Sequence, residues 1–239
     1  MKRFEGDFNN FVDKLIRGEH YSLSRWGDGE LKILENKFID LRDKKNGEFR
    51  YDPNLPEYDN VRDKLISSYT ERDNGYYIGV ACPCCAGRRT FKHMKKMSGQ
   101  DEGNLTWANI FVNANYRHFL GRFVPEMENH DVIMVVNHKA DTSKLSFDVE
   151  RTYHVGTDAW YNDYDVIECI KRDYSDASDK VFLFAAGPLA NILTYELWFN
   201  MSKDNTYIDI GSTLDVQMGM RGTRGYHKGA PTLKKVCTW

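Results

Sequence analysis

The sequence predicts an α/β protein with a Rossmann-like, doubly wound and mostly parallel sheet that is flanked by helices. Two observations carry this prediction. Residues 131–137 and 180–186 are short, continuous apolar runs, as expected of parallel strands covered on both faces. Segments with strand character also alternate along the chain with helical segments, which is the order that builds a parallel sheet.

The first part of the chain begins with an amphipathic helix. Residues 7–18 carry apolar side chains at the i, i+3, i+4 and i+7 spacing of such a helix. A short strand at 21–24 follows, and a glycine-rich turn leads from it into a helix at 31–36. Residues 36–56 are polar and hold two prolines, which predicts a loop or a short hairpin over the site.

The middle of the chain contains a second strand and several helices. Pro56 opens a helix that runs to about Arg72. Residues 76–81 are predicted to form a buried strand that ends at a cysteine-rich turn, and basic residues follow on a helix over 88–96. Residues 105–122 begin as a short strand or turn and continue as a helix.

The last part repeats the alternation of strand and helix. After the first apolar run, residues 151–155 are predicted to form a short strand, and a helix is predicted over 159–174. A Gly-Pro pair forms the turn between the second apolar run and a helix predicted over 189–200. Residues 206–210 form the last strand.

Length and composition favour a single domain. A chain of 239 residues is long enough for one sizeable core. We therefore predict one domain over residues 1–239, which ends in a basic, glycine-rich segment at about 219–239. The formal net charge is −2, so no global basic field attracts nucleic acid.

The termini and the cysteine content predict a cytoplasmic protein without a membrane span. Residues 1–7 lack the apolar core of a signal peptide. No apolar run reaches the length of about 18 residues that a membrane-spanning helix needs. The five cysteines are an odd number, which fits a reducing compartment.

A turn with two carboxylates stands out between the first strand and its helix. Asp28 and Glu30 are bracketed by Gly27 and Gly29, which allow positive φ and close approach of a ligand. An Asp-x-Glu pair supplies hard oxygen ligands for Mg²⁺ or Mn²⁺. The adjacent Arg25 is suited to neutralise a phosphate or to orient a carboxylate. A solvated turn is the alternative, because this pair alone is a weak motif.

The run Arg-Trp-Gly-Asp-Gly-Glu at 25–30 resembles the RxGDGE signature of the GT-D type glycosyltransferases. This bacterial and phage family transfers a sugar from a nucleotide-sugar donor. Three later stretches resemble the same family in the same order, and together they span about residues 20–216. They are Trp107-Ala108-Asn109 with Asn115-Tyr116, Ala186-Gly187-Pro188-Leu189-Ala190, and Asp209-Ile210-Gly211.

The resemblance implies a metal-dependent hexosyl- or pentosyltransferase. Asp28 and Glu30 would hold the divalent cation, Mn²⁺ or Mg²⁺, beside a nucleotide-diphosphate sugar, with a UDP-sugar as the expected donor. The acceptor would be a hydroxyl of a glycan or glycoconjugate, or of a hydroxymethylated base in phage DNA. A non-catalytic module that binds a nucleotide sugar or a phosphate is the alternative.

Three further positions are candidates for the same site. Gly187 lies where a strand turns into a helix, and unpaired N–H groups at a helix N-terminus favour anions. The turn is neither a GxGxxG fingerprint nor a Walker A motif, which argues against a dehydrogenase and a P-loop kinase. Asn109 offers an amide to sugar hydroxyls or to a base. Asp209 ends a strand and is expected at the same sheet edge as Asp28.

The catalytic base is left open between Asp209 and Asp215. In relatives that modify glycans we expect a histidine after the Asp-Ile-Gly triplet, whereas Ser212 stands here. A histidine-assisted role at this point therefore has no support, and the difference suggests a divergent acceptor.

Cys82, Cys84 and Cys85 form the densest cluster of metal-binding residue types. A structural zinc site needs four ligands, usually from two pairs of cysteines. His93 and His118 are the only nearby additions, and neither has a characteristic spacing. We therefore predict a buried or ligand-lining loop instead of a structural zinc site.

The C-terminal segment is rich in glycine and basic residues and has no acid after Asp215. Such a composition does not form a long helix and favours an adaptable loop. It is either a solvated tail or a loop that folds over the site. In the second case Arg221, Arg224 or Lys228 would hold a polyanion, either the donor diphosphate or a phosphate-bearing acceptor.

Overall fold

The computed structural model describes residues 4–43 and 48–228, and these form a seven-stranded sheet and a separate two-stranded hairpin. Neighbouring strands in the large sheet are all parallel, in the order β5-β4-β1-β9-β8-β6-β7. Its strands are β1 (Ser22–Arg25), β4 (Tyr76–Val80), β5 (Leu105–Trp107), β6 (Asp131–Asn137), β7 (Val149–Val155), β8 (Lys180–Ala185) and β9 (Thr206–Asp209). The antiparallel hairpin consists of β2 (Ile39–Asp40) and β3 (Arg50–Tyr51).

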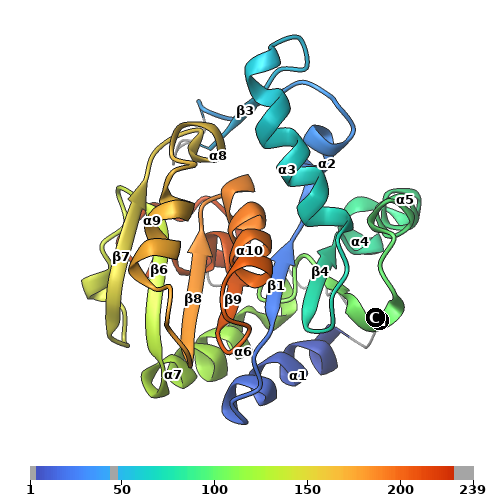
Figure 1. Cartoon of the computed structure of the whole chain (residues 1–239). Coiled ribbons are helices and arrows are strands. Elements are labelled where there is room, and N and C mark those ends of the chain that lie inside the picture. Colours follow the sequence, from blue (N-terminus) through green and yellow to red (C-terminus); the bar gives the residue numbers. More distant parts are fainter. Residues whose placement is uncertain (1–3, 44–47, 229–239) are drawn as a thin grey trace.

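Helices pack on both faces of the sheet, which confirms the predicted doubly wound α/β fold (Figure 1). One face is covered by α2 (Asp28–Leu34), α3 (Asp59–Thr70), α8 (Ala159–Asn162), α9 (Val166–Asp173) and α10 (Pro188–Asn200). The opposite face is covered by α1 (Phe4–Ile16), α6 (Tyr116–His118), the π-helical η4 (Phe119–Phe123) and α7 (Val124–Glu126). At the β4 side of the sheet lie α4 (Pro83–Ala86) and α5 (Arg88–Ser98).

Short 3₁₀ turns join these elements. They are η1 (Pro56–Tyr58), η2 (Glu102–Asn104), η3 (Asn113–Asn115), η5 (Met127–Asn129), η6 (Thr142–Lys144), η7 (Gly211–Leu214) and η8 (Gly225–Lys228).

Two predicted helices differ from the structure. The helix expected over 159–174 is divided into α8 and α9, and the Asp163 carboxylate in the break accepts the main-chain N–H of Gly156 across 2.8 Å. The helix expected within 105–122 is a series of short 3₁₀, α and π turns that extends to Asn129. Pro125 lies in that series and lacks the N–H that a regular helix would use, which accounts for the wide π turn before it.

Helix α10 is mostly apolar and most of its residues are buried, as expected of a helix inside a core. It packs along β1 and β9, and the Ser22 hydroxyl donates to the main-chain oxygen of Thr194 across 2.8 Å. This packing fixes the N-terminus of α10 at the carboxyl edge of the sheet.

The boundary between β1 and β9 is the topological switch point of the sheet. The chain leaves β1 toward α2 on one face, whereas it leaves β9 toward η7, whose Leu214 packs in the core of the other face. Open α/β sheets bind ligands in the crevice that such a divergence creates. The fold therefore places a crevice directly after Arg25 and Asp209.

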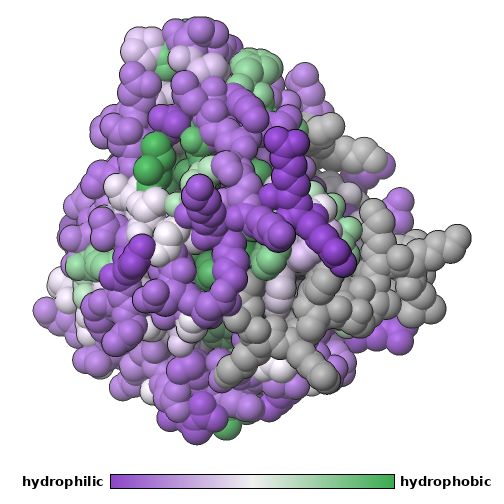
Figure 2. Space-filling view, turned by 90° about the vertical axis from the view of Figure 1, so that its right-hand side faces the viewer, coloured by the Kyte–Doolittle hydropathy of each residue, from purple (hydrophilic) through white to green (hydrophobic). Residues whose placement is uncertain are grey.

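The side of the molecule that carries α5 faces the viewer in Figure 2 and is largely hydrophilic. The exposed basic side chains of α5 lie there: Arg88, Arg89, Lys92 and Lys96. None of the helices within 4–43 and 48–228 has both the length and the apolar character required to cross a membrane.

Candidate functional site

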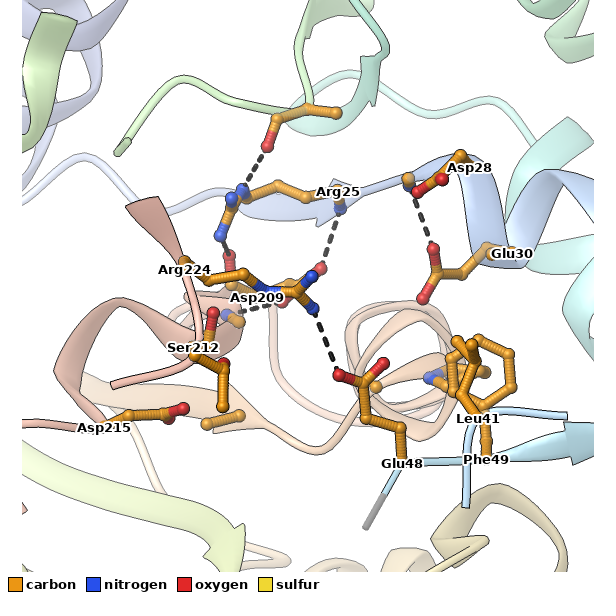
Figure 3. Close-up of a pocket in the computed structure, with 18 of the residues that line it drawn as sticks. Arg25, Asp28, Glu30, Leu41, Glu48, Phe49, Asp209, Ser212, Asp215 and Arg224 are labelled. Carbon is orange, nitrogen blue, oxygen red and sulfur yellow. Dashed lines mark hydrogen bonds and ion pairs between the residues drawn. The ribbon is translucent and has the colours of Figure 1, made fainter. Parts of the chain in front are cut away.

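A cavity of about 1110 Å³ opens at the carboxyl ends of β1 and β9. It brings together residues from both ends of the chain (Figure 3). The site residues predicted from the sequence all line it: Arg25, Gly27, Asp28, Gly29, Glu30, Asn109, Gly187, Asp209, Arg221 and Arg224. Asp215, the other candidate base, is buried in its wall.

The turn between β1 and α2 presents the two predicted carboxylates. The Asp28 carboxylate is exposed, and no hydrogen bond or ion pair to it occurs among the residues that the structure describes. Glu30 is partly buried, and its Oε2 accepts the main-chain N–H of Gly27 across 3.0 Å. Glu30 therefore caps the start of α2 while its side chain borders the cavity.

The glycines of this turn are needed for space and not for positive φ. Gly27 has a φ of −90°, and Gly29 lies within α2, so the predicted use of positive φ is wrong. A Cβ on Gly27 would lie 2.9 Å from Oε2 of Glu30. A Cβ on Gly29 would lie 2.7 Å from Cζ of the buried Phe49. The side chains of Glu30 and Phe49 can approach the turn this closely because Gly27 and Gly29 have no side chain.

The side chain of Arg25 makes its contacts with other parts of the protein. Its Nε donates to the main-chain oxygen of Ala108 across 2.6 Å, and its Nη1 donates to that of Asp209 across 3.3 Å. Its guanidinium lies over the ring of Phe111, 5.3 Å from the centroid. Arg25 thus ties β1 to β9 and to the loop after β5, and it orients neither Asp28 nor Glu30.

Asp209 is buried at the base of the cavity. Its Oδ2 accepts the main-chain N–H of Arg25 across 3.1 Å, and its Oδ1 accepts that of Gly211 across 2.9 Å. Burial raises the pKa of Asp209 to about 6, although the positive charge of Arg25 and the two hydrogen bonds oppose this rise. The expectation that Asp209 shares the sheet edge with Asp28 is confirmed.

The pKa of Glu30 is raised further than that of Asp209. Burial raises its pKa to about 7, and the negative charges of Asp209 and Asp28 add to the effect. Like charges that repel at short range favour the neutral acid. A positive charge placed between these acids would therefore be stabilised by them.

The N-terminus of α10 forms another wall of the cavity. Gly187 has a φ of 56°, which a residue with a side chain rarely adopts, and the helix begins with Pro188. Asn191, one turn into the helix, was not predicted as a site residue. Its Nδ2 donates to Ser24 Oγ across 3.0 Å and to the main-chain oxygen of Arg25 across 2.9 Å. The signal for it was an amide in the first turn of a mostly apolar helix.

Residues 36–56 include a hairpin over the site, as predicted, and Ile39, Leu41, Glu48 and Phe49 line the cavity. Asp158, a non-glycine residue with a φ of 60°, holds it. Its carboxylate accepts hydrogen bonds from Arg50 N, Trp160 Nε1 and Tyr58 Oη at 3.0, 2.9 and 3.1 Å. Its own N–H donates to the main-chain oxygen of Glu48 across 2.9 Å.

The described part of the C-terminal segment, residues 219–228, also lies against the site, and residues 229–239 lie outside the described residues. Tyr226 Oη is 2.8 Å from Ser212 Oγ, and His227 Nε2 is 2.8 Å from the main-chain oxygen of Ser212. Arg224 Nη2 lies 3.4 Å from Glu48 Oε1, which joins the segment to the hairpin across the cavity (Figure 3). Arg221, Arg224 and Lys228 therefore form part of the wall.

The aromatic residues of the stretch Trp107–Tyr116 that resembles the family pack in the protein core. Trp107 is buried and stacks on Phe91 with the ring centroids 5.8 Å apart. Tyr116 is buried as well and packs on Tyr226, at a centroid distance of 4.8 Å. Ala108 and Asn109 are the residues of this stretch that line the cavity.

No family model matches this sequence, and no curated protein sequence matches it. Solved structures do match the fold. A domain of unknown function 1792 (DUF1792), solved with selenomethionine, aligns with a TM-score of 0.58 at 14% identity, over 89% of this chain and 81% of that one. A structure described as showing that this conserved domain has a distinct glycosyltransferase fold gives a TM-score of 0.57 at 15% identity, over 89% and 81%. A DUF1792 protein from Streptococcus sanguinis, described as a new glycosyltransferase, gives 0.57 at 14% identity, over 96% and 91%. The chain therefore has the overall fold of these proteins.

Proposed function

We propose that this protein is a glycosyltransferase that moves a sugar from a nucleotide-diphosphate sugar to an acceptor hydroxyl. One observation carries the proposal. The acids Asp28, Glu30 and Asp209 meet the N-terminus of α10 in a single cavity at the switch point of the sheet. The likeness in fold to proteins described as glycosyltransferases agrees with this assignment.

The acidic turn fits a hard divalent cation such as Mn²⁺ or Mg²⁺. Asp28 brings an exposed carboxylate to the cavity, and the pKa of Glu30 is raised by burial and, to a smaller extent, by the negative charges of Asp209 and Asp28. Carboxylate oxygens are the ligands that these cations prefer. Asp28 and Glu30 would hold the ion, which when bound would neutralise charge on the donor diphosphate and the leaving nucleotide.

The remaining walls suit the other parts of the donor. The N-terminus of α10 meets the cavity at Gly187 and Pro188, and the helix dipole there favours the negative charge of a phosphate. Arg221, Arg224 and Lys228 also line the cavity and add positive charge to it. Asn109 offers its amide to sugar hydroxyls or to the base. A UDP-sugar is the donor that we would test first.

A base must take the proton of the acceptor hydroxyl as it attacks the anomeric carbon. Asp209 and Asp215 are the candidates, because both line the cavity and both are buried. The pKa of Asp209, about 6, leaves it largely ionised at neutral pH. As acceptor we propose a hydroxyl of a glycan or glycoconjugate. A hydroxymethylated DNA base is a second candidate, favoured only by the basic C-terminal segment.

A donor panel tests the proposal directly. The protein is incubated with UDP-, GDP-, CDP- and ADP-sugars with and without Mn²⁺, and nucleotide release and product mass are measured. Thermal shifts with the free nucleotide diphosphates run in parallel, because a ligand that binds the native state raises the melting temperature. One nucleotide is expected to give a metal-dependent shift and turnover. A shift without turnover would indicate a binding module, and the absence of both would reject the assignment.

A further inference from the structure

Three thiols meet at one point on the rim of the cavity. The Sγ atoms of Cys82, Cys84 and Cys85 all lie within 4.8 Å of one another. Cys82 Sγ is 3.1 Å from Cys84 Sγ, which in turn is 3.8 Å from Cys85 Sγ. Cys82 is buried and Cys85 is exposed, and both border the cavity.

The backbone sets this arrangement. Cys82 is the extended N-cap residue of α4, and Pro83 begins a single helical turn behind it. The main-chain oxygen of Cys82 accepts the N–H groups of Cys85 and Ala86 across 3.2 and 3.0 Å. Gly87, with a φ of 84°, ends the turn. The turn therefore brings the two later thiols back toward Cys82 without help from a distant part of the chain.

The spacing of the sulfur atoms suits a soft cation. Thiolates bind Zn²⁺ at about 2.3 Å, so sulfur atoms at tetrahedral angles stand about 3.8 Å apart. The Cys84–Cys85 distance already has this value, and the Cys82–Cys84 pair would have to open slightly. Thiolates select soft or borderline ions such as Zn²⁺ and Cd²⁺, in contrast to the hard oxygens of Asp28 and Glu30.

We propose that Cys82, Cys84 and Cys85 bind one thiophilic cation, such as Zn²⁺ or Cd²⁺, with a further coordination position open to the cavity. Binding would displace the thiol protons into solvent and leave three metal–sulfur bonds. Among the described residues no further His, Cys, Asp or Glu joins the cluster, so the site is not the closed four-ligand type that holds a fold together. The proposal does not depend on the proposed transferase activity.

The test is a titration of the reduced, full-length protein with Cd²⁺ after treatment with a chelator. Binding is measured by the sulfur-to-metal charge-transfer absorption in the ultraviolet and by proton release. We expect saturation at one Cd²⁺ per chain. Cys85→Ser, which changes an exposed side chain, should weaken binding at least tenfold, and Cys84→Ser should do the same. Circular dichroism checks that each variant is folded.

A matched control separates this cluster from the other cysteines. With Cys169 and Cys237 both changed to serine, the charge-transfer band and its stoichiometry should persist. Loss of the band in that control, or an unchanged band in Cys85→Ser, would overturn the assignment. Chelation should leave the protein folded, as checked by circular dichroism, because loss of the fold on chelation would mean a structural metal site.

Discussion

The main-chain N–H of Arg25 donates a hydrogen bond to Oδ2 of Asp209 across 3.1 Å. This bond joins the ends of β1 and β9 at the point where the chain leaves them toward opposite faces of the sheet. Asp209 accepts the N–H of Gly211 with its other oxygen. One buried carboxylate therefore fixes the edges of two strands beneath the cavity.

Asp209→Asn tests this link. An amide has one accepting oxygen, so one of the two main-chain N–H groups would face an NH₂ group. We expect a loss of about 1–3 kcal/mol in the free energy of unfolding, measured with urea. Asp63→Asn, an exposed change on α3, should leave stability unchanged. If Asp209 also takes the acceptor proton, Asp209→Asn should lower turnover by far more than the loss of folded protein explains. The Asp215→Asn variant should then keep most of its turnover.

Glu30→Gln tests the proposed cation site. Glutamine keeps the shape and can still accept the N–H of Gly27, so the variant should fold. It removes one of two negative ligands, and we expect nucleotide release to fall by about 100-fold or more. Excess EDTA should have a similar effect on the native protein. Glu57→Gln, at an exposed position, is the control. Full activity of the native protein in EDTA would contradict the metal assignment.

The raised pKa of Glu30 predicts a pH dependence of stability in the cation-free protein. The folded state holds this proton up to a pKa of about 7, against 4.5 for an ordinary glutamate. Its contribution to stability is therefore complete below pH 4.5 and is lost as the pH rises through 7. The free energy of unfolding of the native protein, compared with that of Glu30→Gln, should decline across this window. A difference that is flat between pH 4.5 and 7.5 would contradict the shift.

Asp158→Ala tests whether the hairpin must be held for donor binding. The change removes acceptors for Arg50, Tyr58 and Trp160, whereas the turn that carries Asp28 and Glu30 makes no contact with Asp158 through these bonds. We expect KM for the donor to rise and the melting temperature to fall. Metal affinity, measured by calorimetry, should change little because Asp28 and Glu30 lie on a separate element. Equal losses in donor and metal binding would mean that the whole site had unfolded.

The strands and the acidic turn were predictable because their signals are local. The apolar runs of β6 and β8 and the strand-to-helix turns at Gly27 and Gly187 lie within a few residues of sequence. The failures concern the environment of a residue. Gly29 is small because Phe49 approaches it, and Arg25 is occupied by Ala108 and Asp209, which no local pattern reveals.

The position of the C-terminal segment is the clearest long-range contribution. Its composition left open whether it is a solvated tail or a wall of the site. In the structure, contacts of Tyr226 and His227 with Ser212 hold residues 219–228 against the site. Sequence patterns do not report such pairings, because the partners are an ordinary tyrosine, histidine and serine.

The last prediction concerns the basic residues of this segment. Arg224 is about half exposed and pairs with Glu48 at 3.4 Å, a contact that contributes little energy at the surface. A donor diphosphate could therefore replace Glu48 as its partner. Arg221→Ala and Arg224→Ala should each weaken nucleotide-sugar binding by about tenfold, measured by calorimetry. Lys139→Ala, an exposed change after β6, should have no effect.

Glu48→Gln separates a role in binding from a role in closing the cavity. If Arg224 binds the diphosphate, release from Glu48 should leave affinity equal or higher. If the Glu48–Arg224 pair is needed to close the site, Glu48→Gln should weaken binding as much as Arg224→Ala does. A segment that instead holds DNA would give an affinity for DNA that falls steeply with salt, by close to one power of the salt concentration for each phosphate neutralised. Unchanged donor and DNA binding after removal of the residues beyond Met220 would leave the segment no role in either, and the proposed contact of Arg221 and Arg224 with phosphate would be wrong.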